Sequence, residues 1–146
     1  MGYRRVIVGS DGSATAELAV REAAKLAAAF GAEVVIVTAY SPDPETAKAH
    51  DSAPEEIAYL VSDVHAAEEL LAGAKAAALA AGAPKVRIHA ESGDPATILI
   101  NAAEELSGDL IVVGSVGMTS RFALGAVPNK VTHHAPCDVL IVQTAS

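Results

Sequence analysis

Three glycines stand close together in the stretch 112–130, VVGSVGMTSRFALGAVPNK. Two residues separate Gly114 from Gly117, and seven separate Gly117 from Gly125. Glycine lets the backbone approach a ligand closely or adopt a positive φ angle. From this spacing two interpretations stay open. The stretch is either a loop that holds a phosphate group or a plain connection between a strand and a helix.

The residues after Gly125 favour an anion site. Ala126 and Val127 enter a helix that we expect to begin near Pro128, and neither side chain can cap it. The first amides of such a helix are free to bind an anion, helped by the helix dipole. The stretch is not a Walker loop, because no Gly-Lys-Ser/Thr follows, and its glycines are too far apart for the dinucleotide fingerprint. Nearby side chains add hydroxyl groups and positive charge: Thr119, Ser120, Arg121 and Lys130.

A second polar group follows the first apolar run, in the sequence GSDGSAT at residues 9–15. Asp11 stands there beside Gly9, Ser10 and Gly12. Its carboxylate could bind a ribose hydroxyl or a metal ion that bridges phosphates. Its alternative role is to shape the start of the next helix. Both roles stay open at this point.

The other reactive side chains give weaker signals. His133 and His134 are adjacent on an expected helix, so they point in different directions and do not form a chelating pair. Cys137, near His134, is expected to pack at the start of the last strand. It is the single cysteine of the chain, which excludes an internal disulfide. We therefore predict no metal site and no catalytic residue.

These groups need a framework, and apolar runs alternate with helical periodicity along the chain. The runs RRVIVG, EVVIVTA, DLIVVG and DVLIVQ suit strands buried on both faces of a parallel sheet. KVRIHAE suits an edge strand, because its apolar residues alternate with Arg87 and His89. Helices are expected over 15–30, from a capping box at Ser52 and Glu55 to Gly82, from Pro95 to Gly108, and near 128–135. Strands alternating with helices predict a parallel sheet with helices on both faces.

Composition limits the class of protein. The chain has 146 residues, of which 51% are hydrophobic, and we expect one domain spanning 1–146. A net charge of −8 argues against binding to nucleic acid or to an anionic membrane surface. No apolar run approaches the roughly 18 residues of a membrane helix, and the first run is too short for a signal peptide. With one cysteine, these features predict a cytoplasmic protein.

Over nearly its whole length the chain resembles the universal stress proteins. The segments that carry the resemblance are VIVGSDGS, GDPATILINAAEE, DLIVVGSVGM and LGAVPNKVTHHAPCDVLIV. The resemblance implies a flavodoxin-like, Rossmann-like α/β fold: an open sheet of five parallel strands in the order 3-2-1-4-5 with helices on both faces. Many family members bind ATP through a motif of Gly, two residues, Gly, nine residues, and Gly followed by Ser or Thr.

The resemblance also implies a site for an adenine nucleotide, with or without Mg²⁺. Asp11 would lie near the adenosine, and the backbone of Ala39 would face the adenine. Gly114 and Gly117 would flank the ribose and phosphates, and the residues from Gly125 would wrap the phosphates. The complete candidate set is Gly9, Ser10, Asp11, Ala39, Gly114, Ser115, Val116, Gly117, Thr119, Arg121, Gly125, Ala126, Val127 and Pro128.

Two departures from the family motif bear on the ligand. Seven residues instead of nine separate Gly117 from Gly125, and Ala126 stands where the family has a hydroxyl. Both changes predict weaker binding of ATP, with a smaller loss for AMP or cyclic AMP. Some relatives with an SVP ending are associated with cyclic AMP, and GAVP at 125–128 is similar.

The leading hypothesis is a nucleotide-binding stress or signalling protein without efficient catalysis, so that any ATP hydrolysis is slow. The alternative is a nucleotide-free dimeric interaction module of the same fold. An enzyme of the ATP-pyrophosphatase type would need a Ser-Gly-Gly-x-Asp-Ser loop, which GSDGSAT does not match. The uncovered edge of the last strand, with the resemblance, predicts a homodimer in which two copies pair antiparallel. The pairing residues would be Val139, Leu140, Ile141, Val142 and Gln143.

Overall fold

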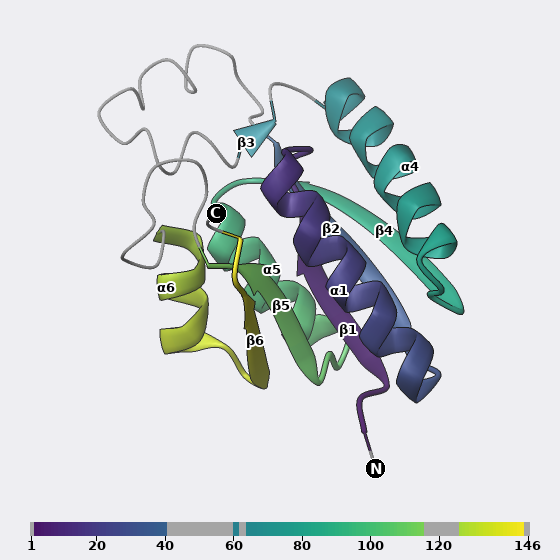
Figure 1. Cartoon of the computed structure of the whole chain (residues 1–146). Helices are drawn as coiled ribbons and strands as arrows, with labels where there is room; N and C mark the ends of the chain where they lie inside the picture. Colours follow the sequence, from purple (N-terminus) through teal and green to yellow (C-terminus); the bar gives the residue numbers. More distant parts are fainter. Residues whose placement is uncertain (1, 41–59, 62–63, 116–125, 145–146) are drawn as a thin grey trace.

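A parallel sheet lies between two layers of helices (Figure 1). The computed structural model describes residues 2–40, 60–61, 64–115 and 126–144. Its strands are β1 (Arg5–Gly9), β2 (Glu33–Tyr40), β3 (Leu60–Val61), β4 (Lys85–Ser92), β5 (Leu110–Gly114) and β6 (Asp138–Val142). Its helices are α1 (Ala14–Phe30), α4 (Val64–Ala80), α5 (Pro95–Glu105) and α6 (Ala126–His134). None of these four helices is long and apolar enough to cross a membrane.

The strand order confirms the prediction. β4 pairs with β2, β2 with β1, β1 with β5 and β5 with β6, and every pair is parallel. Apart from the two-residue β3, this is the order 3-2-1-4-5 of a flavodoxin-like sheet. β3 pairs with Ala39 and Tyr40 at the end of β2. Because β4 occupies one edge of β2 at these residues and β1 ends at Gly9, β3 lies on the edge of β2 that β1 has left.

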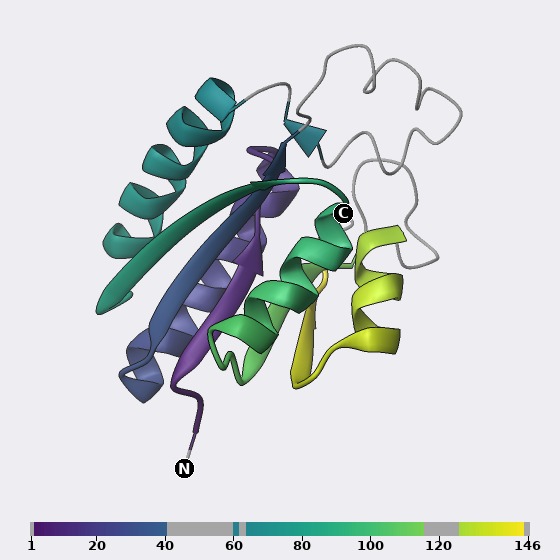
Figure 2. The ribbon, with the colours of Figure 1, turned by 180° about the vertical axis from the view of Figure 1, so that it is seen from behind.

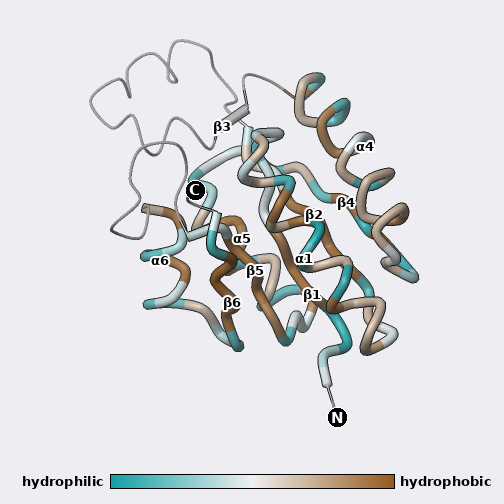
Figure 3. The backbone as a smooth tube through the Cα atoms, viewed as in Figure 1, coloured by the Kyte–Doolittle hydropathy of each residue, from teal (hydrophilic) through white to brown (hydrophobic). Residues whose placement is uncertain are grey.

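Alternate residues of the central strands bury against different helices. Val8 and Ile36 belong to the core under α1 and α4, whereas Ile7 and Val35 belong to the core under α5 and α6. Figure 2 shows α5 and α6 on the face opposite to α1 and α4. Burial on both faces explains why the central strands are apolar without alternation, and β1, β2 and β5 are accordingly among the most hydrophobic segments in Figure 3.

Most helix ends follow the predictions. Ser13 caps α1 by accepting a hydrogen bond from the Ala16 amide, and Gly31 ends that helix at a φ of 68°. Asp94 caps α5, and Pro95 occupies its first turn, as we predicted.

Two helix starts differ from the predictions. α4 begins at Val64, and Leu60, which we had expected on the face of that helix, belongs to β3. Leu60 pairs with the end of β2, at the edge that β1 leaves without a partner, and this pairing overrides the helical pattern of the sequence around Leu60. Ser52 and Glu55 lie outside the described residues. α6 begins at Ala126 instead of near Pro128, so the proline falls within the first helical turn, where its missing N–H costs little.

A buried carboxylate joins the amino-terminal ends of three strands. Glu33 in β2 is 6% exposed, and its Oε1 lies 2.8 Å from Nε of Arg5 in β1. Its Oε2 lies 3.3 Å from Lys85 and 3.4 Å from Arg87, both in β4. Burial raises the pKa of Glu33, but the hydrogen bond from Arg5 and the contacts with Lys85 and Arg87 outweigh it, so the pKa is lowered.

We therefore expect Glu33→Gln to reduce the free energy of unfolding at pH 7 by about 2 kcal/mol, the typical contribution of a hydrogen bond to a charged group. A lowered pKa in the folded state contributes stability above the unfolded pKa of about 4.3, and this stability is lost as the pH falls through the folded pKa. The difference in the free energy of unfolding between wild type and variant should thus become smaller below about pH 4.5. Urea unfolding across this range measures it. Glu22→Gln, which breaks an exposed pair with Lys25, is the control, and a gap that does not depend on pH would contradict the account.

Candidate functional site at the carboxyl ends of the strands

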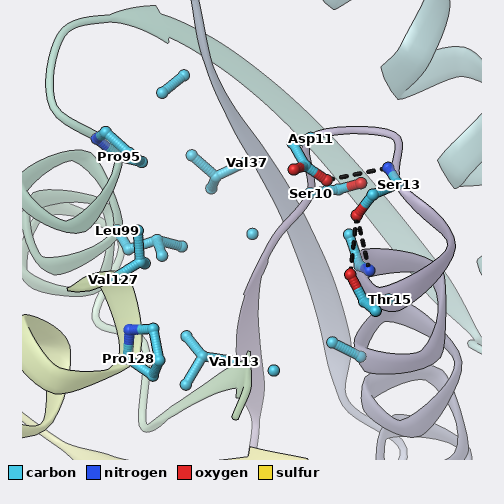
Figure 4. A pocket seen from close by; sticks show the side chains of 15 residues that line it. Ser10, Asp11, Ser13, Thr15, Val37, Pro95, Leu99, Val113, Val127 and Pro128 are labelled. Carbon is cyan, nitrogen blue, oxygen red and sulfur yellow. Dashed lines mark hydrogen bonds between the residues drawn. The ribbon is translucent and has the colours of Figure 1, made fainter. Parts of the chain in front are cut away.

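A cleft of about 570 Å³, open to solvent, lies where the carboxyl ends of β1, β2 and β5 meet the first turns of α1, α5 and α6 (Figure 4). This is the place where open α/β sheets bind ligands. The fold thus builds a candidate ligand site from segments far apart in the sequence.

The cleft brings together seven of the residues that we predicted for the site. They are Gly9, Ser10, Asp11, Ala39, Gly114, Val127 and Pro128. Two other predicted residues, Ser115 and Ala126, are described but do not line the cleft. The remaining five lie outside the described residues: Val116, Gly117, Thr119, Arg121 and Gly125. Binding by each of the fourteen stays a prediction.

Asp11 shapes the turn that leads into α1. Its Oδ1 accepts a hydrogen bond of 2.9 Å from the Ser13 amide, and the Ser10 hydroxyl oxygen accepts one of 3.1 Å from the Gly12 amide. Gly12 has a φ of 83°, which favours glycine at this position. Ser13 is the residue that caps α1, so Asp11 stabilises the turn before the helix and not the helix start itself. Within the described residues its Oδ2 makes no hydrogen bond, and this oxygen can accept one from a ligand.

The walls and the rim of the cleft differ in polarity. Val37, Leu99, Val113 and Val127 form apolar walls, whereas Ser10, Asp11, Ser13 and Thr15 gather on the α1 side (Figure 4). Such a slot can hold a flat apolar ring and place its polar substituents against hydroxyl and carboxylate groups. The cleft therefore suits a ligand that has both an apolar and a polar part.

Sequence reasoning missed eight residues that line the cleft. They are Ser13, Thr15, Ala16 and Ala19 of α1 and its entry, Val37 of β2, Pro95 and Leu99 of α5, and Val113 of β5. Some of this was accessible from the sequence. Val37 shares a face with Ala39 by the two-residue period of a strand, and Leu99 follows Pro95 by one helical turn.

Gly114 and Ser115 connect the end of β5 to the chain after β6. A Cβ at Gly114 would lie 3.0 Å from Cγ2 of Thr144, so close packing also favours glycine here. The Ser115 hydroxyl donates a 2.7 Å hydrogen bond to Gln143 and accepts one of 3.1 Å from the Thr144 amide. The serine is buried, and the two hydrogen bonds of its hydroxyl join the end of β5 to the chain after β6.

The first turn of α6 borders the cleft through Val127 and Pro128. Its first turn holds no acidic residue, which keeps the positive end of the helix dipole available to an anion. Lys130, which we expected to supply positive charge to a phosphate, instead lies with its Nζ 2.9 Å from Oδ2 of Asp94. Burial raises the pKa of Asp94, but Lys130 and Thr97 outweigh it and hold this pKa below its usual range. The ammonium group of Lys130 is thus ion-paired with Asp94, the residue that caps α5.

The other reactive side chains stay apart in the described part of the chain. No group of three or more His, Cys, Asp or Glu side chains there could hold a metal ion. The rings of His133 and His134 lie 6.4 Å apart with a tilt of 48°, and Nδ1 of His133 lies 2.7 Å from the Asn129 carbonyl oxygen. Burial, and then the charges of Asp138 and Asp109, raise the pKa of the Cys137 thiol, which disfavours the reactive thiolate.

Comparison with known proteins gives consistent similarities. The model of the universal stress protein family matches residues 2–143. A universal stress protein of Mycobacterium tuberculosis is 41% identical over 144 residues, which cover 97% of each chain. A universal stress protein solved in complex with cAMP superposes with a TM-score of 0.76 at 35% identity, covering 99% of this chain and 100% of that one. One from Archaeoglobus fulgidus in complex with dAMP gives a TM-score of 0.70 at 25% identity, covering 98% and 100%.

Proposed function

The chain belongs to the universal stress protein family, and from this premise we propose that it binds an adenine nucleotide in the cleft and acts in a stress response or signalling pathway. The observation that carries the proposal is the cleft itself. Apolar walls face a polar rim there, and a helix start without acidic residues lies at one end. Two related structures, at 35% and 25% identity, hold cAMP and dAMP, which supports an adenine ligand.

Each part of the ligand has a complementary part of the cleft. The adenine ring lies between the apolar walls, beside the backbone of Ala39. The ribose donates a hydroxyl hydrogen to the free oxygen of Asp11. The phosphate meets the amides at the start of α6 and the glycine loop before them. A monophosphate needs less of that loop than ATP does, so we propose AMP or cyclic AMP as the better ligands.

We propose binding without efficient catalysis. Asp11 is the only titratable side chain on the described lining of the cleft, and one of its oxygens is already bonded to the Ser13 amide. Phosphoryl transfer depends on positioned cations and a base, and the described lining supplies no lysine or arginine. Any hydrolysis of ATP is therefore slow, with or without Mg²⁺.

Calorimetric titration with AMP, cyclic AMP and GMP tests this proposal. GMP carries the same phosphate as AMP on a different base, so it separates base recognition from anion binding. We expect AMP and cyclic AMP to bind more tightly than GMP. Binding of none of the three, with no nucleotide released when freshly purified protein is denatured, would favour the nucleotide-free interaction module instead.

Asp11→Asn should weaken AMP binding by roughly tenfold or more, because hydrogen bonds to charged groups contribute about 1.5–3 kcal/mol. The asparagine keeps an oxygen that can accept from the Ser13 amide, so the thermal stability of the unliganded protein should change little. Asp11→Ala removes both functions and should lower stability by about 1 kcal/mol as well. Titration and thermal melting of both variants separate the two roles. Wild-type affinity in the asparagine variant would limit Asp11 to the turn.

We further propose a homodimer through β6. In the described chain no strand pairs with its outer edge, and Leu140 and Ile141 are each 36% exposed. Neighbouring residues of a strand point to opposite faces, so both faces of this edge strand expose an aliphatic side chain. A second copy that continues the sheet would cover both.

A further inference from the structure

β4 forms the edge of the sheet opposite to β6 (Figures 1 and 2). It pairs with β2 along all eight of its residues, and among the described strands none pairs with its outer edge. An unpaired edge of this length presents a row of backbone donors and acceptors that another chain can use.

The side chains of β4 follow a regular two-face pattern. One face of β4 carries Lys85, Arg87 and His89. Arg87 and His89 are in register with Val35 and Val37 of β2, which belong to the core under α5 and α6. These side chains therefore lie on the same face of the sheet as α5 and α6. The intervening Val86 and Ala90 pack on the core under α1 and α4. Ile88 lies between them and is 39% exposed. The edge thus carries Lys85, Arg87, His89 and, near its end, Glu91 on one face and aliphatic side chains on the other.

The cations at this edge exceed the local negative charge. Lys85 and Arg87 of this edge and Arg5 of β1 all contact Glu33, so three cations surround one carboxylate. Arg5 makes the short contact with this carboxylate, whereas its Oε2 accepts no hydrogen bond from Lys85 or Arg87. The side chains of Lys85 and Arg87 are 72% and 44% exposed, so both remain accessible from solvent while they lie beside Glu33. The acidic protein thus carries a surplus of positive charge here.

A second copy of the chain does not complement this edge. In an antiparallel pair of two β4 strands centred on Ile88, Glu91 of one copy would lie across from Lys85 of the other, but Arg87 would lie across from His89. In a pair centred on His89, Glu91 would lie across from Arg87, but Lys85 would lie beyond the end of the partner strand at Ser92, so neither register gives both cations a carboxylate. A strand that pairs here must bring its own carboxylates opposite Lys85 and Arg87.

We infer that the outer edge of β4 is a docking site for an extended acidic segment of a partner protein, in which carboxylate and aliphatic side chains alternate. The segment adds a strand to the sheet through backbone hydrogen bonds. Its carboxylates pair with Lys85 and Arg87, and its aliphatic side chains cover Ile88 on the other face.

A labelled sample of the whole protein tests this inference by NMR at low salt. The probe is an acetylated and amidated heptapeptide of alternating Glu and Val, and its counterpart alternates Lys and Val. We expect the Glu/Val peptide to shift the β4 amides and slow their hydrogen exchange, and the Lys/Val peptide to leave them unchanged. Lys85→Gln/Arg87→Gln should weaken the Glu/Val peptide by about tenfold.

Arg21→Gln/Lys25→Gln is the matched control, because it removes the same charge from exposed positions of α1. It should leave the affinity within about twofold of wild type. Equal binding of both peptides, shifts away from β4, or an equal loss in the two double variants would overturn the inference. A spectrum of each variant without peptide verifies that the sheet is intact.

Discussion

Leu140→Lys/Ile141→Lys is expected to convert the proposed homodimer into a monomer. In the proposed dimer both side chains are buried when two β6 strands pair. The change would place four lysines in that interface, two from each copy, with no carboxylate opposite them. An unpaired buried charge costs several kcal/mol, which is enough to abolish association at micromolar concentration. Light scattering coupled to size exclusion measures the mass directly.

The matched control is Leu18→Lys/Leu79→Lys. These leucines are 44% and 46% exposed on α1 and α4, so the control adds the same charge away from β6. It should remain a dimer. A monomeric wild type at micromolar concentration would contradict the proposed interface, and so would a dimeric Leu140→Lys/Ile141→Lys variant.

Ala126→Ser is expected to strengthen ATP binding by roughly ten- to a hundredfold, the range that one hydrogen bond to a charged group supplies. Ala126 is the first residue of α6, directly before Val127 in the cleft wall, and it has no hydroxyl to donate to a phosphate. AMP and cyclic AMP should gain less, because they depend less on the residues around the outer phosphates. Titration of wild type and variant with the three nucleotides measures this selectivity.

Ala135→Ser, just beyond the other end of α6, makes the same chemical change away from the cleft and should alter none of the affinities. If the wild type binds ATP tightly and Ala126→Ser changes nothing, the missing hydroxyl does not limit the site. If no nucleotide binds before or after the change, the interaction-module hypothesis gains support.

The parts of the fold that depend on local pattern were predictable from the sequence. Continuous apolar runs identified β1, β2 and β5 as strands buried on both faces, and the alternation around Arg87 identified β4 as an edge strand. The same reasoning was wrong for β6, because this apolar run lies at the other edge of the sheet and its residues are exposed or half-buried. Asp94 and Pro95 identified the start of α5. The strand order was predicted from the resemblance to a family, because the pattern of a single segment does not determine which other strands it pairs with.

The parts that depend on distant contacts were not predictable. Leu60 leaves a helical pattern because the end of β2 offers it backbone partners. Lys130 binds Asp94, 36 residues away, so its sequence neighbourhood gave no sign that its charge was engaged. The Ser115 hydroxyl bonds to Gln143, 28 residues away, for the same reason. In each case the tertiary structure determines the partner of the residue.

The measurement that tests the central claim most directly is an NMR titration of the labelled protein with AMP. It reports both whether an adenine nucleotide binds and where. The account predicts saturable shifts of the amides of 9–16, 37–39, 113–114 and 126–127, which border the cleft, while the amides of β4 at 85–88 stay unchanged. Saturable shifts confined to another surface, or no shifts at millimolar AMP, would contradict it.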